Sequence, residues 1–151
     1  MNHDHLPRPP LILGVAGVMP PLLCVTLALV DPALTLPATI GGGLYGALIL
    51  SFLGGMWWME ALLRRDARGW PYLVAVLPSL IGWALLLPPL LAGGSIRVAL
   101  ILLGLVIMIT PFADLRIGEA MRAVAGWARL RWALSLGLGG LTLVLGLIAS
   151  R

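Results

Sequence analysis

The most constraining feature of this sequence is a series of apolar runs, each long enough to cross a lipid bilayer. A membrane-spanning helix needs about 20 mostly apolar residues, because it rises only about 1.5 Å per residue. Apolar runs in the buried core helices of soluble proteins are shorter, about 10–14 residues. The runs therefore predict five transmembrane helices, at residues 11–30, 38–63, 71–91, 95–112 and 131–150.

Charged residues are too scarce to cover a water-facing surface. They make up 11% of the 151 residues, against 60% hydrophobic residues, whereas soluble domains carry about 25% charged residues. A separate soluble domain is therefore excluded, and residues 1–10 form only a short polar tail. The predicted fold class is an all-α membrane protein: a bundle of five transmembrane helices plus one short amphipathic interfacial helix.

The ten basic residues are all arginines, and they divide unequally between the two sides of such a bundle. Arg97 and Arg151 fall on one side, and eight arginines fall on the other. The positive-inside rule then places the N-terminus in the cytoplasm and the C-terminus in the periplasm. Because the arginines flank membrane spans, no nucleic-acid partner is expected. The eight are Arg8, Arg64, Arg65, Arg68, Arg116, Arg122, Arg129 and Arg131.

Residues 114–130 are too polar to cross the membrane and have the pattern of an amphipathic interfacial helix. An apolar stripe contains Ile117, Met121, Val124 and Ala128. The segment is interpreted either as a connection between two spans or as a surface that contacts anionic lipid or a partner. The arginines expected at lipid headgroups are Arg64, Arg65, Arg116, Arg122 and Arg129.

Small residues recur every four positions in the second predicted span and every three or four positions in the last one. Such ridges let membrane helices approach closely. They are interpreted either as packing surfaces within this chain or as an interface with another protein. The second span carries Gly43, Ala47, Ser51 and Gly55, and the last span carries Ser135, Gly139, Thr142 and Gly146.

Three notable side chains follow the ridge of the second span. Trp57 and Trp58 lie near its cytoplasmic end, where an aromatic belt is expected. Glu60 is interpreted as the only acidic residue within a span, which makes it a possible intramembrane polar site. Arg64 lies one helical turn further on, so an interfacial ion pair between Glu60 and Arg64 is the simpler hypothesis.

No residue pattern points to catalysis or to a bound cofactor. There is no nucleophile with an adjacent base, no phosphate-binding loop and no pair of carboxylates. Cys24 has no cysteine or histidine at metal-binding spacing, and the His3-Asp4-His5 tripeptide is weak evidence for a metal. We therefore expect no enzyme activity, no cofactor and no metal.

Three blocks of the sequence resemble a known family. The stretch YGALILSFLGGMWW (45–58) is similar to a sequence typical of the family called domain of unknown function 3429, which includes the eukaryotic transmembrane protein 69. LPSLIGWALLLP (77–88) and WARLRWALSLGLGGLTL (127–143) match it more weakly. The resemblance implies a five-span protein of the bacterial inner membrane. It gives little information about any activity.

The chain departs from this family at one informative position. The family commonly has histidine or arginine, then tryptophan and glycine, after its paired glycines. Here these positions are Trp57, Trp58 and Met59. The departure favours a packing or docking role for Trp57, because an indole offers a large surface and one hydrogen-bond donor.

These features favour a non-enzymatic accessory or assembly subunit that packs against a larger inner-membrane complex, of a respiratory or photosynthetic kind. Its expected partners are membrane lipids and that complex. The alternative is a small transporter or a lipid- or quinone-binding protein. It is motivated by Pro20 and Pro21 in the middle of the first span, where broken helices can expose backbone carbonyls to a ligand.

Overall fold

The computed structural model describes residues 8–118 and 123–149, and every regular element in these ranges is helical. The first span consists of α1 and α2, and a short 3₁₀ helix, η1, connects it to α3. The helices are α1 (Arg8–Ala16), α2 (Met19–Val30), η1 (Pro32–Leu34), α3 (Thr35–Leu63), α4 (Trp70–Leu91), α5 (Ile96–Ile117) and α7 (Trp127–Ile148).

Five of the described helical segments are long and apolar enough to cross a membrane. They are α1 with α2, η1 with α3, and then α4, α5 and α7. The predicted all-α membrane fold with five spans is confirmed, and the chain is a multi-pass membrane protein. Many large apolar side chains are exposed on the outer faces of the helices, where lipid takes the place of water.

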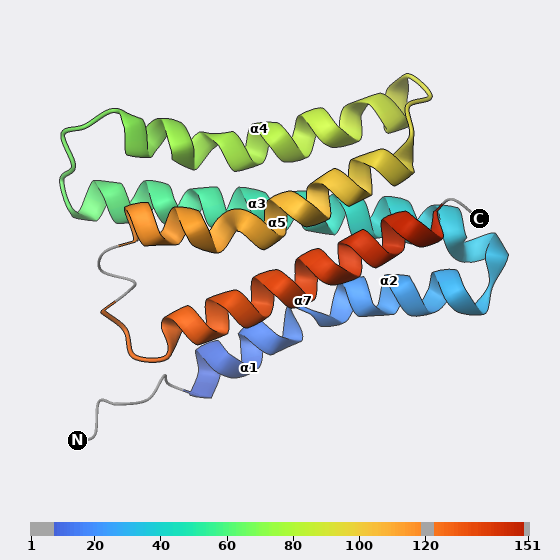
Figure 1. The fold of residues 1–151 in the computed structure, drawn as a ribbon, viewed down its shortest axis with the longest axis horizontal. Helices are drawn as coiled ribbons and strands as arrows, with labels where there is room; N and C mark the ends of the chain where they lie inside the picture. The colour runs from blue at the N-terminus through green and yellow to red at the C-terminus, as the bar shows by residue number, and fades with distance from the viewer. Residues whose placement is uncertain (1–7, 119–122, 150–151) are drawn as a thin grey trace.

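The five spans pack side by side with α3 and α5 in the middle (Figure 1). The outer positions are taken by α4 on one side and by α1 and α2 on the other, with α7 between α5 and the α1–α2 pair. The loop between α3 and α4, the start of α1, the end of α5 and the start of α7 all lie at one end of the bundle. We call this the arginine-rich end.

The most extensive helix contact is between α5 and α7. A Cβ atom on Gly104 would lie 2.7 Å from the carbonyl oxygen of Gly139, and one on Gly146 would lie 3.0 Å from Leu100 Cβ. The first distance is too short for a side chain, so Gly104 is needed for this approach, and the second leaves little room for one at Gly146. The α5 side chains Leu100, Leu103 and Ile107 are almost completely buried, which makes α5 the centre of the bundle.

The first span is interrupted one turn before its prolines. The break lies at Gly17 and Val18, and Pro20 and Pro21 belong to the first turn of α2. We expected the prolines to kink or break the span in its middle. An interruption is present, a few residues before the prolines, and Pro20 and Pro21 begin α2 because a missing N–H costs nothing in the first turn, where backbone donors have no partner within the helix.

The segment predicted to lie on the membrane surface, 114–130, is divided in the structure. Its first four residues complete α5, and its last four form the first turn of α7. Residues 119–122, which include Arg122, lie outside the described residues. The fourth span therefore extends beyond the predicted end at residue 112 and brings Asp114 into the bundle.

Candidate functional site

A buried ion pair joins the end of α5 to the beginning of α7. Arg131 Nε lies 2.7 Å from Asp114 Oδ2, and each residue is only 6% exposed. The two atoms do not meet hydrogen-bond geometry, so the contact is an electrostatic pair. A single buried charge is strongly unfavourable. The last turn of α5 and the first turns of α7 therefore depend on each other to stay inside the bundle.

Three more side chains complete the polar cluster, which we define as Trp57, Thr110, Asp114, Arg131 and Ser135. Trp57 Nε1 donates a hydrogen bond to Asp114 Oδ1. The terminal nitrogens of Arg131 donate to Ser135 Oγ at 2.6 Å and to Thr110 Oγ1 at 3.1 Å. The polar cluster therefore ties α3, α5 and α7 together at one level of the bundle.

Helical spacing explains why these residues meet. Thr110 and Asp114 are four residues apart on α5, and Arg131 and Ser135 are four residues apart on α7, so each pair lies on one helix face. The glycine contact between α5 and α7 brings these two faces together.

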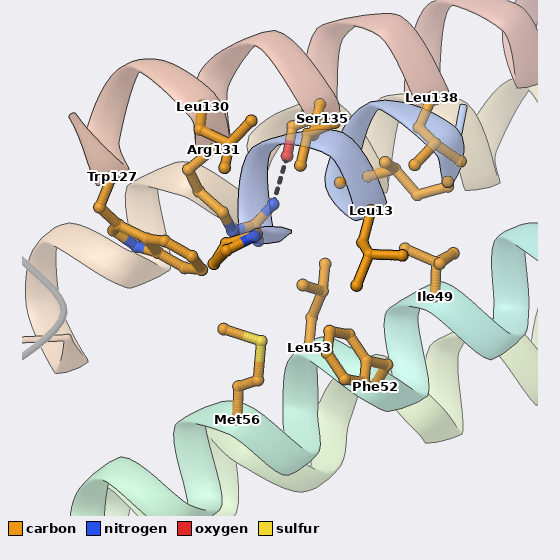
Figure 2. Close-up of a pocket in the computed structure, with 15 residues that line it drawn as sticks. Leu13, Ile49, Phe52, Leu53, Met56, Trp127, Leu130, Arg131, Ser135 and Leu138 are labelled. Atoms are coloured by element: carbon orange, nitrogen blue, oxygen red, sulfur yellow. Dashed lines mark hydrogen bonds between the residues drawn. The ribbon is translucent and has the colours of Figure 1, made fainter. Parts of the chain in front are cut away.

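A cavity of about 310 Å³ lies beside the polar cluster, between α1, α3, α5 and α7 (Figure 2). Its walls are almost entirely apolar, and Arg131 is the only charged side chain among the described residues that line it. Figure 2 shows Trp127, Arg131 and Ser135 following α7 along one side, with Met56, Leu53 and Phe52 facing them from α3. The lining residues are Pro10, Leu13, Gly14, Gly17, Ile49, Phe52, Leu53, Met56, Ile107, Trp127, Leu130, Arg131, Leu134, Ser135 and Leu138.

Trp127 adds a second polar group to the cavity wall. Its indole Nε1 is buried, yet it has no hydrogen-bond partner within the described part of the chain. Trp127 precedes Arg131 by one helical turn, so both side chains lie on the same face of α7. An unpaired buried donor is rare in proteins because it loses its hydrogen bond to water. The nitrogen is covered by neighbouring atoms, so it can donate to a molecule in the cavity only after the Trp127 side chain has moved.

α1 forms one side of the cavity and is weakly anchored. It is described over its whole length and has no buried residue, although Pro10, Leu13 and Gly14 line the cavity. At its end, Tyr45 Oη donates a 2.7 Å hydrogen bond to the carbonyl oxygen of Gly17. This carbonyl is the one that Pro21, four residues later, cannot pair with. Because the Tyr45 hydroxyl is bonded to this carbonyl, the carbonyl does not support the hypothesis that a broken first span exposes backbone oxygens to a transported ligand.

The comparison with protein families decides the affiliation of the chain. The sequence model of the protein family of unknown function DUF3429 matches residues 6–148, which is nearly the whole sequence. The chain belongs to the DUF3429 family. No curated protein and no solved structure matches it. The polar cluster and the cavity of this DUF3429 protein both lie within the matched region.

The two small-residue ridges predicted in this DUF3429 protein have different surroundings. In α3, Gly43 faces Leu86 and Leu100, and Ala47 faces Gly82 of α4, so this half of the ridge packs within the chain. Ser51 and Gly55 are exposed, and no described atom lies within 4 Å of a Cβ atom built on Gly55. In α7, Ser135, Gly139, Thr142 and Gly146 are all buried, and Ser135, Gly139 and Gly146 contact α5.

The two adjacent tryptophans also have different environments. Trp57 is buried and bonded to Asp114. Trp58 is exposed, and its ring makes an edge contact with Tyr72 at a centroid distance of 5.1 Å. Trp57 therefore supplies a hydrogen-bond donor inside the bundle, at the position where the family resemblance leads us to expect a basic residue.

The predicted headgroup arginines and Glu60 lie at the arginine-rich end. Arg65, Arg116 and Arg129 are exposed. Arg64 Nε lies 3.7 Å from Glu60 Oε1, and Glu60 is 7% exposed. In the neighbouring loop, two side-chain hydrogen bonds from Arg68 hold the pKa of the Asp66 carboxyl well below its usual range.

Sequence reasoning missed the polar cluster because it placed Asp114 outside the membrane. Glu60 was expected to be the only acidic residue within a span, and this is wrong, because Asp114 is buried within α5. Arg131 was counted only as an orienting charge. The available signal was a pair of four-residue spacings, Thr110 with Asp114 and Arg131 with Ser135, at the facing ends of consecutive spans.

Proposed function

We propose that this DUF3429 protein binds an amphiphilic molecule from the membrane, of the lipid or quinone class, and performs no chemistry on it. The observation that carries the proposal is the one-sided polarity of the cavity. Its walls are apolar, while the groups that can form hydrogen bonds, from Trp127, Arg131 and Ser135, follow a single face of α7. Ligand pockets typically combine a mostly apolar lining with a few placed polar groups.

The position of the cavity supports access from the bilayer. α1 separates the cavity from the outside of the bundle, and its Ile12 and Leu13 are among the most exposed apolar side chains. A helix without buried residues has little packing energy to hold it in place. A membrane molecule could therefore reach the cavity by displacing α1, without passing through water.

Filling the cavity tests this function. Leu134→Trp introduces a large ring from a residue that lines the cavity. Leu136→Trp is the matched control, because Leu136 lies on the same helix and is exposed. Native mass spectrometry of the protein, purified from membranes in a mild detergent, should show a bound amphiphile in the wild type and in Leu136→Trp. The bound fraction should fall about tenfold or more in Leu134→Trp.

Two results would contradict the proposal. One is a wild-type protein that carries no amphiphile and takes up none when lipids and quinones are added back. The other is equal occupancy in Leu134→Trp and Leu136→Trp, which would place any bound lipid on the outer surface.

The second candidate function is the accessory or assembly subunit of a larger inner-membrane complex. A specific observation favours it: Ser51 and Gly55 of the α3 ridge are exposed, and no described atom lies within 4 Å of a Cβ atom built on Gly55. Beside it, a groove of about 510 Å³ between α3 and α4 is lined by Ser51, Ser79 and Trp83 together with leucines. A helix of a respiratory or photosynthetic complex could approach closely there.

Gly55→Leu tests this second function without disturbing the bundle, because there is open space around Gly55. A tagged wild-type protein should copurify with a stoichiometric membrane partner in mild detergent, and Gly55→Leu should lose that partner while keeping its own thermal stability. A wild-type protein that runs alone as a monomer would rule out the subunit role.

For location, we propose the bacterial inner membrane with the N-terminus in the cytoplasm. The described arginines support this orientation, because Arg97 alone lies away from the arginine-rich end and cytoplasmic flanks carry the excess of arginine. A reporter fused after the last residue should be active only if it functions in the periplasm. Activity of a cytoplasm-only reporter at that position would contradict the orientation.

A further inference from the structure

We infer that the cavity beside α7 selects an amphiphile whose headgroup is neutral and accepts hydrogen bonds, such as the carbonyl of a quinone ring, over an anionic headgroup. This inference rests on the proposed binding function and specifies its ligand class. Three observations carry it: the charge balance of the polar cluster, the direction of its hydrogen bonds and the size of the cavity.

The charge balance argues against an anion. Arg131 would attract a phosphate or carboxylate if it stood alone. Its charge is already matched by Asp114 at 2.7 Å, and no other charged residue is among the described residues of the lining. An anion placed beside Arg131 would also approach the Asp114 carboxylate through a medium that screens charge poorly. The pair therefore offers little net attraction to a charged headgroup.

The hydrogen bonds at the cavity wall leave donors available. A guanidinium carries five N–H groups. Arg131 Nε lies beside Asp114, one terminal nitrogen donates to Ser135 and the other donates to Thr110. Each terminal nitrogen therefore keeps one further N–H group. Trp127 Nε1 has no acceptor among the described residues, but it is covered by neighbouring atoms, so it meets a ligand only if the Trp127 side chain moves. A ligand that accepts hydrogen bonds satisfies these donors, whereas a purely apolar molecule leaves them unpaired.

The size of the cavity favours one ring or one chain. An engineered cavity of about 150 Å³ is known to bind benzene, and this cavity has about twice that volume, 310 Å³. A substituted ring with the beginning of a tail fits this space. The two acyl chains of a phospholipid require more room, so they would have to remain in the bilayer.

Three probes with the same alkyl tail separate the possibilities. Decylbenzoquinone carries neutral acceptors, decyl phosphate carries an anion, and decylbenzene carries neither. Each would be titrated into the delipidated full-length protein in maltoside micelles, and the bound fraction would be measured by native mass spectrometry. We expect decylbenzoquinone to bind about tenfold more tightly than either of the other probes.

Trp127→Phe examines the unpaired donor directly. It should weaken decylbenzoquinone about three- to tenfold, the effect of one hydrogen bond, and leave decylbenzene unchanged. Trp70→Phe, at an exposed indole that lines neither this cavity nor the groove between α3 and α4, is the matched control and should change neither probe. If the quinone affinity is unchanged in Trp127→Phe, the role of this donor is wrong and the inference falls.

The remaining outcomes separate the inference from the proposed function. Tighter binding of decyl phosphate, blocked by Leu134→Trp, would overturn the neutral-headgroup inference while the cavity remained a binding site. No saturable binding of any probe would overturn both. Asp114→Asn, if it folds, should shift the preference toward decyl phosphate, because it leaves the Arg131 charge unmatched. An unchanged preference in folded Asp114→Asn would contradict the charge-balance argument.

Discussion

Glu60 and Asp114 are both carboxylates near the arginine-rich end of the bundle, and both are almost completely buried. Their partners differ. Glu60 lies 3.7 Å from Arg64, which is four residues later on the same helix and is 20% exposed. Asp114 lies 2.7 Å from Arg131, which is on another helix and is itself buried. The first pair forms within one turn at the membrane edge, whereas the second requires two helices to be packed correctly.

The difference shows that an ion pair within one helix and an ion pair between two helices affect stability differently. A pair within one helix adds a little to helix stability and can reach water or headgroups. A pair between helices is favourable only when its geometry is right, and the loss of one partner leaves a buried charge. The Asp114–Arg131 pair therefore fixes the register of α5 against α7.

The largest effect is expected from Arg131→Met. It should lower the free energy of unfolding by about 3–5 kcal/mol, because Asp114 is left charged and buried. The double variant Arg131→Met with Asp114→Asn should recover part of this loss, since it removes the unmatched charge and keeps an acceptor oxygen for Trp57. Unfolding by sodium dodecyl sulfate in mixed micelles measures both. Equal losses of unfolding free energy in the single and double variants would show that an unmatched Asp114 charge is not the cause of the loss.

Trp57→Phe should have the next largest effect. It removes the hydrogen bond from the indole to Asp114, and bonds to charged groups are worth about 1.5–3 kcal/mol. Trp58→Phe changes the same residue type at the adjacent, exposed position and should cost less than about 1 kcal/mol. The same unfolding assay compares the two variants. Equal losses of stability would show that the hydrogen bond from Trp57 to Asp114 adds no stability.

Glu60→Gln should lower the free energy of unfolding by less than about 1 kcal/mol, because a pair with a partly exposed arginine contributes little. The measurement is again the unfolding midpoint in mixed micelles. A loss as large as that of Arg131→Met would mean that the two carboxylates are equivalent, and the comparison drawn above would fail.

The smallest effect concerns Asp66 in the loop between α3 and α4. Its pKa is lowered in the folded protein by hydrogen bonds from Arg68, so its contribution to loop order is present above the ordinary carboxyl pKa of about 3.9. The contribution is lost as the pH falls through the lower folded pKa. Hydrogen exchange of the Arg68 amide, which donates to Asp66 Oδ1, should therefore accelerate only in strong acid. Asp66→Asn should abolish this pH dependence, and a wild-type loop that opens near neutral pH would contradict it.

The five helices could be predicted because each depends mainly on its own composition. A long apolar run must be helical in lipid, where backbone groups have no water to bind. The end of α5 could not be predicted in this way. Pro111 and Asp114 both suggest that a span has ended, and only the partner supplied by α7 makes the extra turn stable.

The candidate site was harder to predict for the same reason. Trp57 was identified as unusual, but its partner Asp114 lies 57 residues away in the sequence. The cavity depends on where α1 ends and α2 begins. The sequence indicated a break near Pro20, but not that Tyr45 would hold the end of α1 through the Gly17 carbonyl. Such contacts arise from tertiary packing and leave no periodic pattern.

The buried pair between α5 and α7 also constrains how the protein is made. A charged side chain near the middle of a lone helix opposes its insertion into the bilayer by about 2.5–3.5 kcal/mol, and by less near the ends. Asp114 is translated before Arg131, so α5 first meets the membrane with an unmatched carboxylate. Biogenesis would be eased if α5 waited beside the insertion machinery until α7 emerged, and the two helices then moved into the lipid together as a hairpin.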